Sequence, residues 1–189
     1  HESYMSASTE TSSDFWKPLL PDSLSVSRAD DQNQERFTMV SGTGFQAVRH
    51  QFDKPIDLKQ TPQMSLNLNQ SEGTRVNFHL QVDGQGYLIQ CSAPLTEMKR
   101  ILIPSGETTT EQFRLRVMSI DTVQSRLLGK VAPGPISVNL ADLLAQRQHQ
   151  GPGKLEAVTI GNTSNEHYLL AGGSGNTAGE WYELSQLYF

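Results

Sequence analysis

The chain has 189 residues, of which 36% are hydrophobic and 19% are charged, and its formal net charge is −5. This length suits a single globular domain with a substantial core, and the negative charge argues against nucleic acid, whose phosphates attract a basic surface. No apolar run approaches the roughly 20 residues of a membrane-spanning helix, so membrane insertion is not expected. A single cysteine, Cys91, excludes both an intramolecular disulfide framework and a cysteine-rich zinc site.

The beginning of the chain is polar and has no hydrophobic period. Residues 1–13, "HESYMSASTETSS", are therefore predicted to be a flexible leader, and residues 14–189 a single β-sandwich domain. The leader lacks the charged-then-apolar order of a signal peptide. Order is expected to begin near "DFWKPLLP", which supplies apolar anchors.

A period of two residues dominates the rest of the chain. In order, strands are predicted over residues 23–28, 36–41, 45–52, 63–70, 77–82, 86–91, 100–103, 112–120, 136–140, 155–161, 167–172 and 181–189. Two segments favour helix: residues 121–131, for one or two turns, and residues 139–150, where Asn139 is suited to cap the first turn. Many short strands separated by Gly- and Pro-containing turns predict an all-β fold, a two-sheet antiparallel β-sandwich of jelly-roll type.

The alternation also separates core positions from surface positions. In the last strand, Trp181 and Tyr182 are neighbours and must face opposite sides of the sheet, so one ring is expected in the core and the other at the surface. The predicted core residues are Phe45, Val48, Phe52, Leu66, Leu68, Phe78, Leu80, Val82, Phe113, Leu115, Val117, Val158 and Ile160.

Strand 77–82, "NFHLQV", carries amides and an imidazole on the face away from the core, where Lys, Glu and Thr are common on solvated sheets. Sugar hydroxyls both donate and accept, so amides and guanidinium groups bind them well, and aromatic rings stack on sugar C–H faces. We therefore expect a groove that binds a polysaccharide, and paired arginines would suit an acidic one. The predicted ligand-binding residues are Asn67, Asn77, His79, Gln81, Tyr87, Arg114, Arg116 and Trp181. An ordinary solvated sheet face is the open alternative.

The segment "FDKPIDLKQTPQMSLNLNQSEGTRVNFHLQVDG" is similar to the middle of galactose-binding-like carbohydrate-binding modules, and "LEAVTIGN" followed by a Gly-rich insert and "WYELSQLYF" resembles their end. The resemblance covers roughly residues 45–189 and implies a jelly-roll module that binds polysaccharide without catalysis. It implies a secreted, extracellular or periplasmic location, and fusion to or association with a glycan-active enzyme. Such modules commonly hold a structural calcium with a carboxylate on the last strand, where this chain has Glu183 in place of the more usual Asp.

Two other functions stay open. Jelly-roll polysaccharide lyases use a His or Tyr base and an Arg that neutralises the carboxylate of a uronic-acid polymer, and His79, Tyr87 and Arg114 are residues of those types. The chain lacks the compact signatures of such lyases, so a non-catalytic role is favoured and no catalytic residue is assigned. A structural or assembly β-sandwich, which associates through an exposed edge strand, is the third class.

Overall fold

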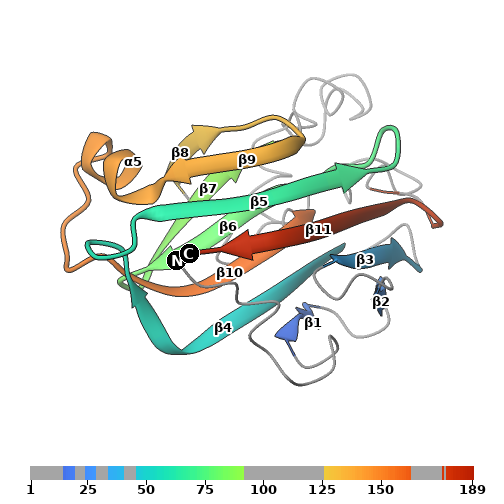
Figure 1. The fold of residues 1–189 in the computed structure, drawn as a ribbon, viewed down its shortest axis with the longest axis horizontal. Coiled ribbons are helices and arrows are strands. Elements are labelled where there is room, and N and C mark those ends of the chain that lie inside the picture. The colour runs from blue at the N-terminus through green and yellow to red at the C-terminus, as the bar shows by residue number, and fades with distance from the viewer. Residues whose placement is uncertain are drawn as a thin grey trace, which may run out of the picture.

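The computed structural model describes residues 15–19, 24–28, 34–40, 46–91, 126–162, 176 and 178–189. In this part of the chain, the strands form two sheets that lie one behind the other (Figure 1). Sheet A contains, in spatial order, β2 (Leu24–Arg28), β3 (Gln34–Met39), β11 (Trp181–Tyr188), β5 (Gln63–Gln70) and β9 (Gly134–Asn139). Sheet B contains β1 (Lys17–Pro18), β4 (Gln46–Asp57), β10 (Lys154–Asn162), β6 (Asn77–Val82), β7 (Gln85–Gln90) and β8 (Arg126–Lys130).

The strand order is that of a jelly roll, as the sequence predicts. Four antiparallel pairs are nested within one another and alternate between the sheets: β3 with β11 in sheet A, β4 with β10 in sheet B, β5 with β9 in sheet A, and β6 with β7 in sheet B. This nesting gives the two interlocked Greek keys of that fold. The all-β sandwich is therefore confirmed, with one addition, the parallel edge strand β8 beside β7.

The core lies between the two sheets and is built by the alternation read from the sequence. The predicted core residues that the structure describes are all buried: Val48, Phe52, Leu66, Leu68, Phe78, Leu80, Val82, Val158 and Ile160. Phe45, Phe113, Leu115 and Val117 lie outside the described residues. In the last strand Tyr182 is the buried ring and Trp181 the partly exposed one.

A buried hydrogen bond joins the sheets through this core. The Tyr182 hydroxyl of β11 donates to the Ile160 carbonyl oxygen of β10 at 2.7 Å. Burial raises the pKa of the Tyr182 hydroxyl, so the group stays protonated and remains a donor. The next residue, Gly161, has φ +136°, and a Cβ there would lie 2.7 Å from the Tyr182 hydroxyl oxygen and 2.3 Å from the Gln46 carbonyl oxygen. The close approach of β4 in the same sheet and of the Tyr182 hydroxyl from the other sheet therefore requires glycine at this position.

The helix predicted to start at Asn139 is present as α5 (Leu140–Gln146). The Asn139 side-chain oxygen accepts a hydrogen bond from the Asp142 N–H at 2.9 Å, which satisfies one of the free donors of the first turn. Within the described ranges, no helix is both long enough and apolar enough to cross a membrane.

The structure corrects the expectation of helical turns within residues 121–131. Residues 126–130 form the strand β8, which pairs with β7, and its Leu128 is buried in the core. Pairing with a strand distant in sequence and burial against another sheet are not contained in local helix propensity. Residues 121–125, the expected leader over residues 1–13, and the strands expected over 100–103, 112–120 and 167–172 lie outside the described residues.

Phe78 tests the assignment of the core face, because its side chain is completely buried. Phe78→Ala is expected to lower the free energy of unfolding by about 3–5 kcal/mol through lost burial and the cavity left behind. Urea unfolding measures this change, with Val40→Ala as the control, since Val40 is 55% exposed and its truncation should cost less than about 0.5 kcal/mol. A loss below about 1 kcal/mol for Phe78→Ala would mean that the two faces of β6 are assigned backwards.

Candidate functional site

The structure divides the predicted ligand-binding residues between the two outer faces of the sandwich. Asn77, His79 and Gln81 lie on the outward side of β6 in sheet B, whereas Asn67 of β5 and Trp181 of β11 lie on the outward side of sheet A. The predicted groove shared by Asn67 and the three β6 residues is therefore wrong. Strands β5 and β6 follow each other in the chain but belong to different sheets, so their outward side chains point to opposite sides of the molecule.

Tyr87 was predicted to be a stacking surface for a sugar, and the structure corrects this as well. Its side chain is completely buried, because it faces the core opposite Leu80. A ring in this position offers no surface to a ligand. Arg114 and Arg116 lie outside the described residues.

We name the outward surface of β3, β11 and β5 the Trp181 face. These strands are adjacent at the centre of sheet A, and in their register Glu183 lies between Arg36 and Asn69. The members of the face are Gln34, Arg36, Thr38, Gln63, Ser65, Asn67, Asn69, Trp181, Glu183, Ser185 and Tyr188. This set joins two of the predicted residues, Asn67 and Trp181, to polar neighbours and to a second aromatic ring.

Tyr188 reaches this face because β11 contains a β-bulge. Strict alternation would place Tyr188 in the core with Tyr182. A register shift after residue 185, where Gln186 has φ +55°, inserts one extra residue into the strand. Tyr188 therefore pairs with Ser65 on the outward side, while the preceding Leu187 is buried. Sequence reasoning missed Tyr188, and the available signal was the polar Gln186 at a position where alternation calls for an apolar side chain.

A neighbouring ion pair holds the Trp181 ring in place. The guanidinium carbon of Arg36 lies 4.0 Å from the ring centre of Trp181, and Arg36 Nη2 donates to Glu183 Oε1 at 3.2 Å. Gln34 Nε2 donates to the other carboxylate oxygen of Glu183 at 2.7 Å. These contacts fix the orientation of the indole ring. The positive charge of Arg36 and the negative charge of Glu183 also cancel on this surface.

The Glu183 carboxylate does not fit the structural calcium that the family resemblance implies. Both of its oxygens accept hydrogen bonds from side chains, and the charge beside it is the cationic guanidinium of Arg36. Calcium takes about six to eight oxygen ligands, mostly from carboxylates and carbonyls. In the described ranges, no group of three or more His, Cys, Asp or Glu side chains is arranged to hold a metal ion.

The outer face of sheet B carries a different polar arrangement. Thr159 of β10 pairs with Arg49 of β4 on one side and with His79 of β6 on the other, so the three form one cross-strand row. Arg49 Nη2 donates to Gln81 Oε1 at 2.6 Å, and Arg49 Nη1 donates to Thr159 Oγ1 at 3.4 Å. His79 is only 4% exposed and Thr159 2%, whereas Arg49 and Gln81 are half-buried. Arg49 and Gln81 are therefore the accessible part of the row.

Sequence reasoning did not single out Arg49, although the signal was present. In the segment "VRHQF", Arg49 alternates with Val48, which faces the core, so its side chain had to point outward. Asn77, by contrast, was predicted to contact a ligand, and its side-chain oxygen accepts a hydrogen bond from the Cys91 N–H at 2.7 Å. That bond ties the start of β6 to the end of β7.

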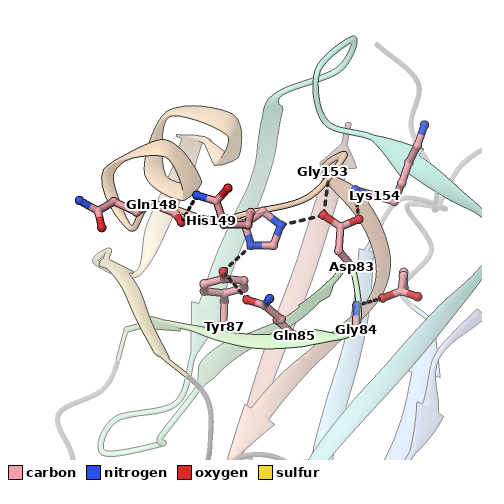
Figure 2. A network of polar contacts seen from close by, with 10 residues as sticks. Asp83, Gly84, Gln85, Tyr87, Gln148, His149, Gly153 and Lys154 are labelled. Carbon is pink, nitrogen blue, oxygen red and sulfur yellow. Dashed lines mark hydrogen bonds and ion pairs between the residues drawn. The ribbon is translucent and has the colours of Figure 1, made fainter.

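A polar network surrounds Asp83, in the two-residue turn between β6 and β7 (Figure 2). Its carboxylate accepts hydrogen bonds from His149 Nε2 at 2.7 Å, the Gly153 N–H at 2.8 Å and the Lys154 N–H at 2.9 Å. The loop after α5 passes so close that a Cβ at Gly151, where φ is +142°, would lie 2.6 Å from Asp83 Oδ2. Burial raises the pKa of Asp83, but the hydrogen bonds from His149, Lys154 and Gly153 together lower it by more. The net pKa of Asp83 is therefore below its ordinary value.

This network contains residue types that a lyase uses, but its Tyr87 is buried out of reach of a substrate. The other ring nitrogen of His149 contacts the Tyr87 hydroxyl, which gives a chain from Asp83 through His149 to Tyr87. Tyr87 is completely buried, and this burial raises the pKa of its hydroxyl above the ordinary value, although the nearby charge of Arg126 lowers it in part. A general base needs contact with the substrate and a pKa near the working pH. The network therefore fits a structural connection between the turn and the loop.

Comparisons with known proteins give distant structural similarity. No family model and no curated protein matches the chain. A solved xyloglucanase domain of NopAA, a type three effector from Sinorhizobium fredii, in complex with cellobiose, is similar with a TM-score of 0.47 and 9% identity, over 93% of this chain and 90% of that one. A low-affinity xylan-binding module from Roseburia intestinalis is similar with a TM-score of 0.39 and 12% identity, over 93% of this chain and 92% of that one. A solved exo-β-agarase structure is similar with a TM-score of 0.37 and 8% identity, over 91% of this chain and 24% of that one.

These values are too low for the neighbours to carry an argument about this chain. The jelly-roll assignment rests on the nested strand pairs described above. The resemblance to galactose-binding-like modules stays a prediction.

The hydrogen bonds to Asp83 predict a specific dependence of stability on pH. Because its folded-state pKa is depressed, the stabilisation is fully present above the unfolded-state pKa of about 3.9 and is lost as the pH falls through the lower folded-state value. Asp83→Asn should lower the free energy of unfolding at pH 7 by about 1–3 kcal/mol and flatten its fall below about pH 4. Urea unfolding between pH 7 and 3 measures both effects, with the exposed Asp53→Asn as the control. Identical pH profiles for wild type and Asp83→Asn would contradict the assigned network.

Proposed function

We propose that the protein is a non-catalytic carbohydrate-binding module and that the Trp181 face contacts the polysaccharide. The observation that carries the proposal is the pair of outward aromatic side chains on one strand, Trp181 and Tyr188, with a polar row between them. At about 3.3 Å per strand residue, and allowing for the bulge, the two rings are ~20 Å apart along β11. This spacing suits an extended chain of several sugar rings that lies along the strand.

The side chains between the rings match the chemistry of sugar hydroxyls. Asn67 and Asn69 of β5 and Ser185 of β11 offer donors and acceptors at fixed positions on a rigid sheet. Arg36 keeps N–H groups beyond the one that it donates to Glu183, and 42% of its side chain is exposed. Rigid strands and an oriented indole leave little ordering to be done on binding.

The balance of charge favours an uncharged sugar on this face. Arg36 and Glu183 neutralise each other, so no net positive charge is available there for a carboxylate or sulfate group. The acidic polysaccharide expected from Arg114 and Arg116 would need an unpaired cation, which the members of the Trp181 face do not supply. We therefore propose an uncharged glycan as the ligand of this surface.

The wider setting follows from the same proposal. A module of this kind increases the residence time of an attached enzyme on its polymer, so fusion to or association with a glycan-active enzyme is proposed, in a secreted, extracellular or periplasmic location.

Substitution of the two outward rings tests the binding surface. Trp181→Ala and Tyr188→Ala should each weaken binding to an uncharged polysaccharide by about tenfold, or roughly 1.4 kcal/mol, because each removes a stacking surface from a rigid site. Affinity electrophoresis against soluble xyloglucan, xylan and galactomannan measures the retardation. Gln51→Ala is the matched control, since Gln51 is exposed on the opposite sheet.

Three outcomes would overturn the proposal. Normal retardation of both aromatic variants on a polymer that retards the wild type would place the site elsewhere. Release of ultraviolet-absorbing unsaturated products from a uronic-acid polymer would indicate a lyase. Absence of retardation on every glycan, together with concentration-dependent self-association, would indicate an assembly domain.

A further inference from the structure

The outer face of sheet B places two cations directly opposite each other. Lys17 of β1 pairs in register with Arg49 of β4, and the next pair, Pro18 with Val48, faces the core, so Lys17 and Arg49 share the outward side. Directly opposed residues of antiparallel strands have Cβ atoms about 5 Å apart, and like charges at that separation destabilise the sheet. Lys17 is exposed and Arg49 is half-buried.

Neither cation is neutralised. The Arg49 guanidinium donates to Gln81 Oε1 at 2.6 Å and to Thr159 Oγ1 at 3.4 Å, and both acceptors are uncharged. These bonds fix the plane of the guanidinium and leave its full charge in place. Among the described residues, Lys17 and Arg49 take part in no ion pair, and the exposed Asp53, four residues along β4, forms none with either of them.

The comparison with the Trp181 face shows that this arrangement is particular to sheet B. There, Arg36 lies 3.2 Å from the carboxylate of Glu183 and its charge is cancelled. Arg49 instead keeps an oriented guanidinium with N–H groups that make no bond to a carboxylate, and the exposed Lys17 lies opposite it in register. A planar guanidinium and a neighbouring ammonium are the groups that bind carboxylates.

We propose that Lys17 and Arg49, with Gln81 beside them, form a second site that binds the carboxylate groups of an acidic polysaccharide. The bound carboxylate relieves the repulsion between the two cations and accepts hydrogen bonds from Arg49, while the amide of Gln81 is placed to contact a sugar hydroxyl. The site lies on the sheet opposite the Trp181 face, and it does not depend on the function proposed for that face. With both sites occupied, one molecule would connect an uncharged glycan to an acidic one.

The test uses an oligogalacturonate of defined length, its methyl-esterified form, and titration calorimetry at low salt. Arg49→Gln should weaken binding of the acidic oligomer by about tenfold and Lys17→Gln by about threefold, because each removes one of two cations from the site. The matched controls are Arg126→Gln and Lys59→Gln, which remove the same charges from exposed positions elsewhere and should change the affinity by less than about twofold. The chain of 189 residues carries a net charge of −5, so general attraction to a polyanion does not mimic the site.

Several results would overturn the inference. Unchanged affinity for the acidic oligomer in both Lys17→Gln and Arg49→Gln would show that these residues do not form the site. An equal loss of affinity in the two controls would show the same. Binding of the methyl ester as tight as binding of the acid would exclude recognition of the carboxylate, and tighter binding of a sulfated dextran would assign the site to sulfate instead. Lys17 lies exposed on a two-residue edge strand, so its variant is informative even if Arg49→Gln disturbs the fold.

The Trp181→Ala variant separates this inference from the proposed function. It should keep the affinity for oligogalacturonate while losing that for the uncharged polymer. Loss of oligogalacturonate binding in Trp181→Ala would put the acidic sugar on sheet A and overturn the second site. If wild type binds no uncharged glycan but binds oligogalacturonate through Arg49, the proposed function fails and this inference stands.

Discussion

The hydrogen bond from Tyr182 to the Ile160 carbonyl is the interaction on which the outer surfaces depend. It connects β11, at the centre of sheet A, to β10 of sheet B across the core. Since side chains alternate along a strand, an inward Tyr182 requires an outward Trp181. The bulge at Gln186 then turns Tyr188 to the same outward surface. The aromatic character of the Trp181 face is therefore a consequence of how the last strand is held in the core.

The position of a single carboxylate makes the two outer faces electrostatically different. Glu183 lies in the strand beside Arg36 and cancels its charge, whereas the neighbours of Arg49 are the uncharged Gln81 and Thr159. Both arginines are oriented by hydrogen bonds, but the Arg36–Glu183 pair is neutral, whereas Arg49 keeps its positive charge. A sandwich built from two polar faces can in this way offer surfaces for chemically different ligands without any change in the core.

Much of the fold could be predicted from the sequence, because one physical pattern repeats in strand after strand. The alternation in residues 77–82 correctly placed Phe78 in the core, and the cap at Asn139 correctly located the helix that follows. The strand at residues 126–130 could not be predicted in the same way. Its backbone partners lie in β7, and its stabilisation through Leu128 exists only once the two sheets have met.

The candidate site shows the same division. The sequence by itself determined which side chains share one side of a given strand, since the period of two follows from backbone geometry. Only the tertiary structure decided which strands become neighbours, and it placed Asn67 and His79 on opposite sides of the molecule although their strands are consecutive. It also buried Tyr87 against His149. The reason is that the assignment of a strand to a sheet depends on contacts between distant segments, and these contacts leave no periodic signal within either segment.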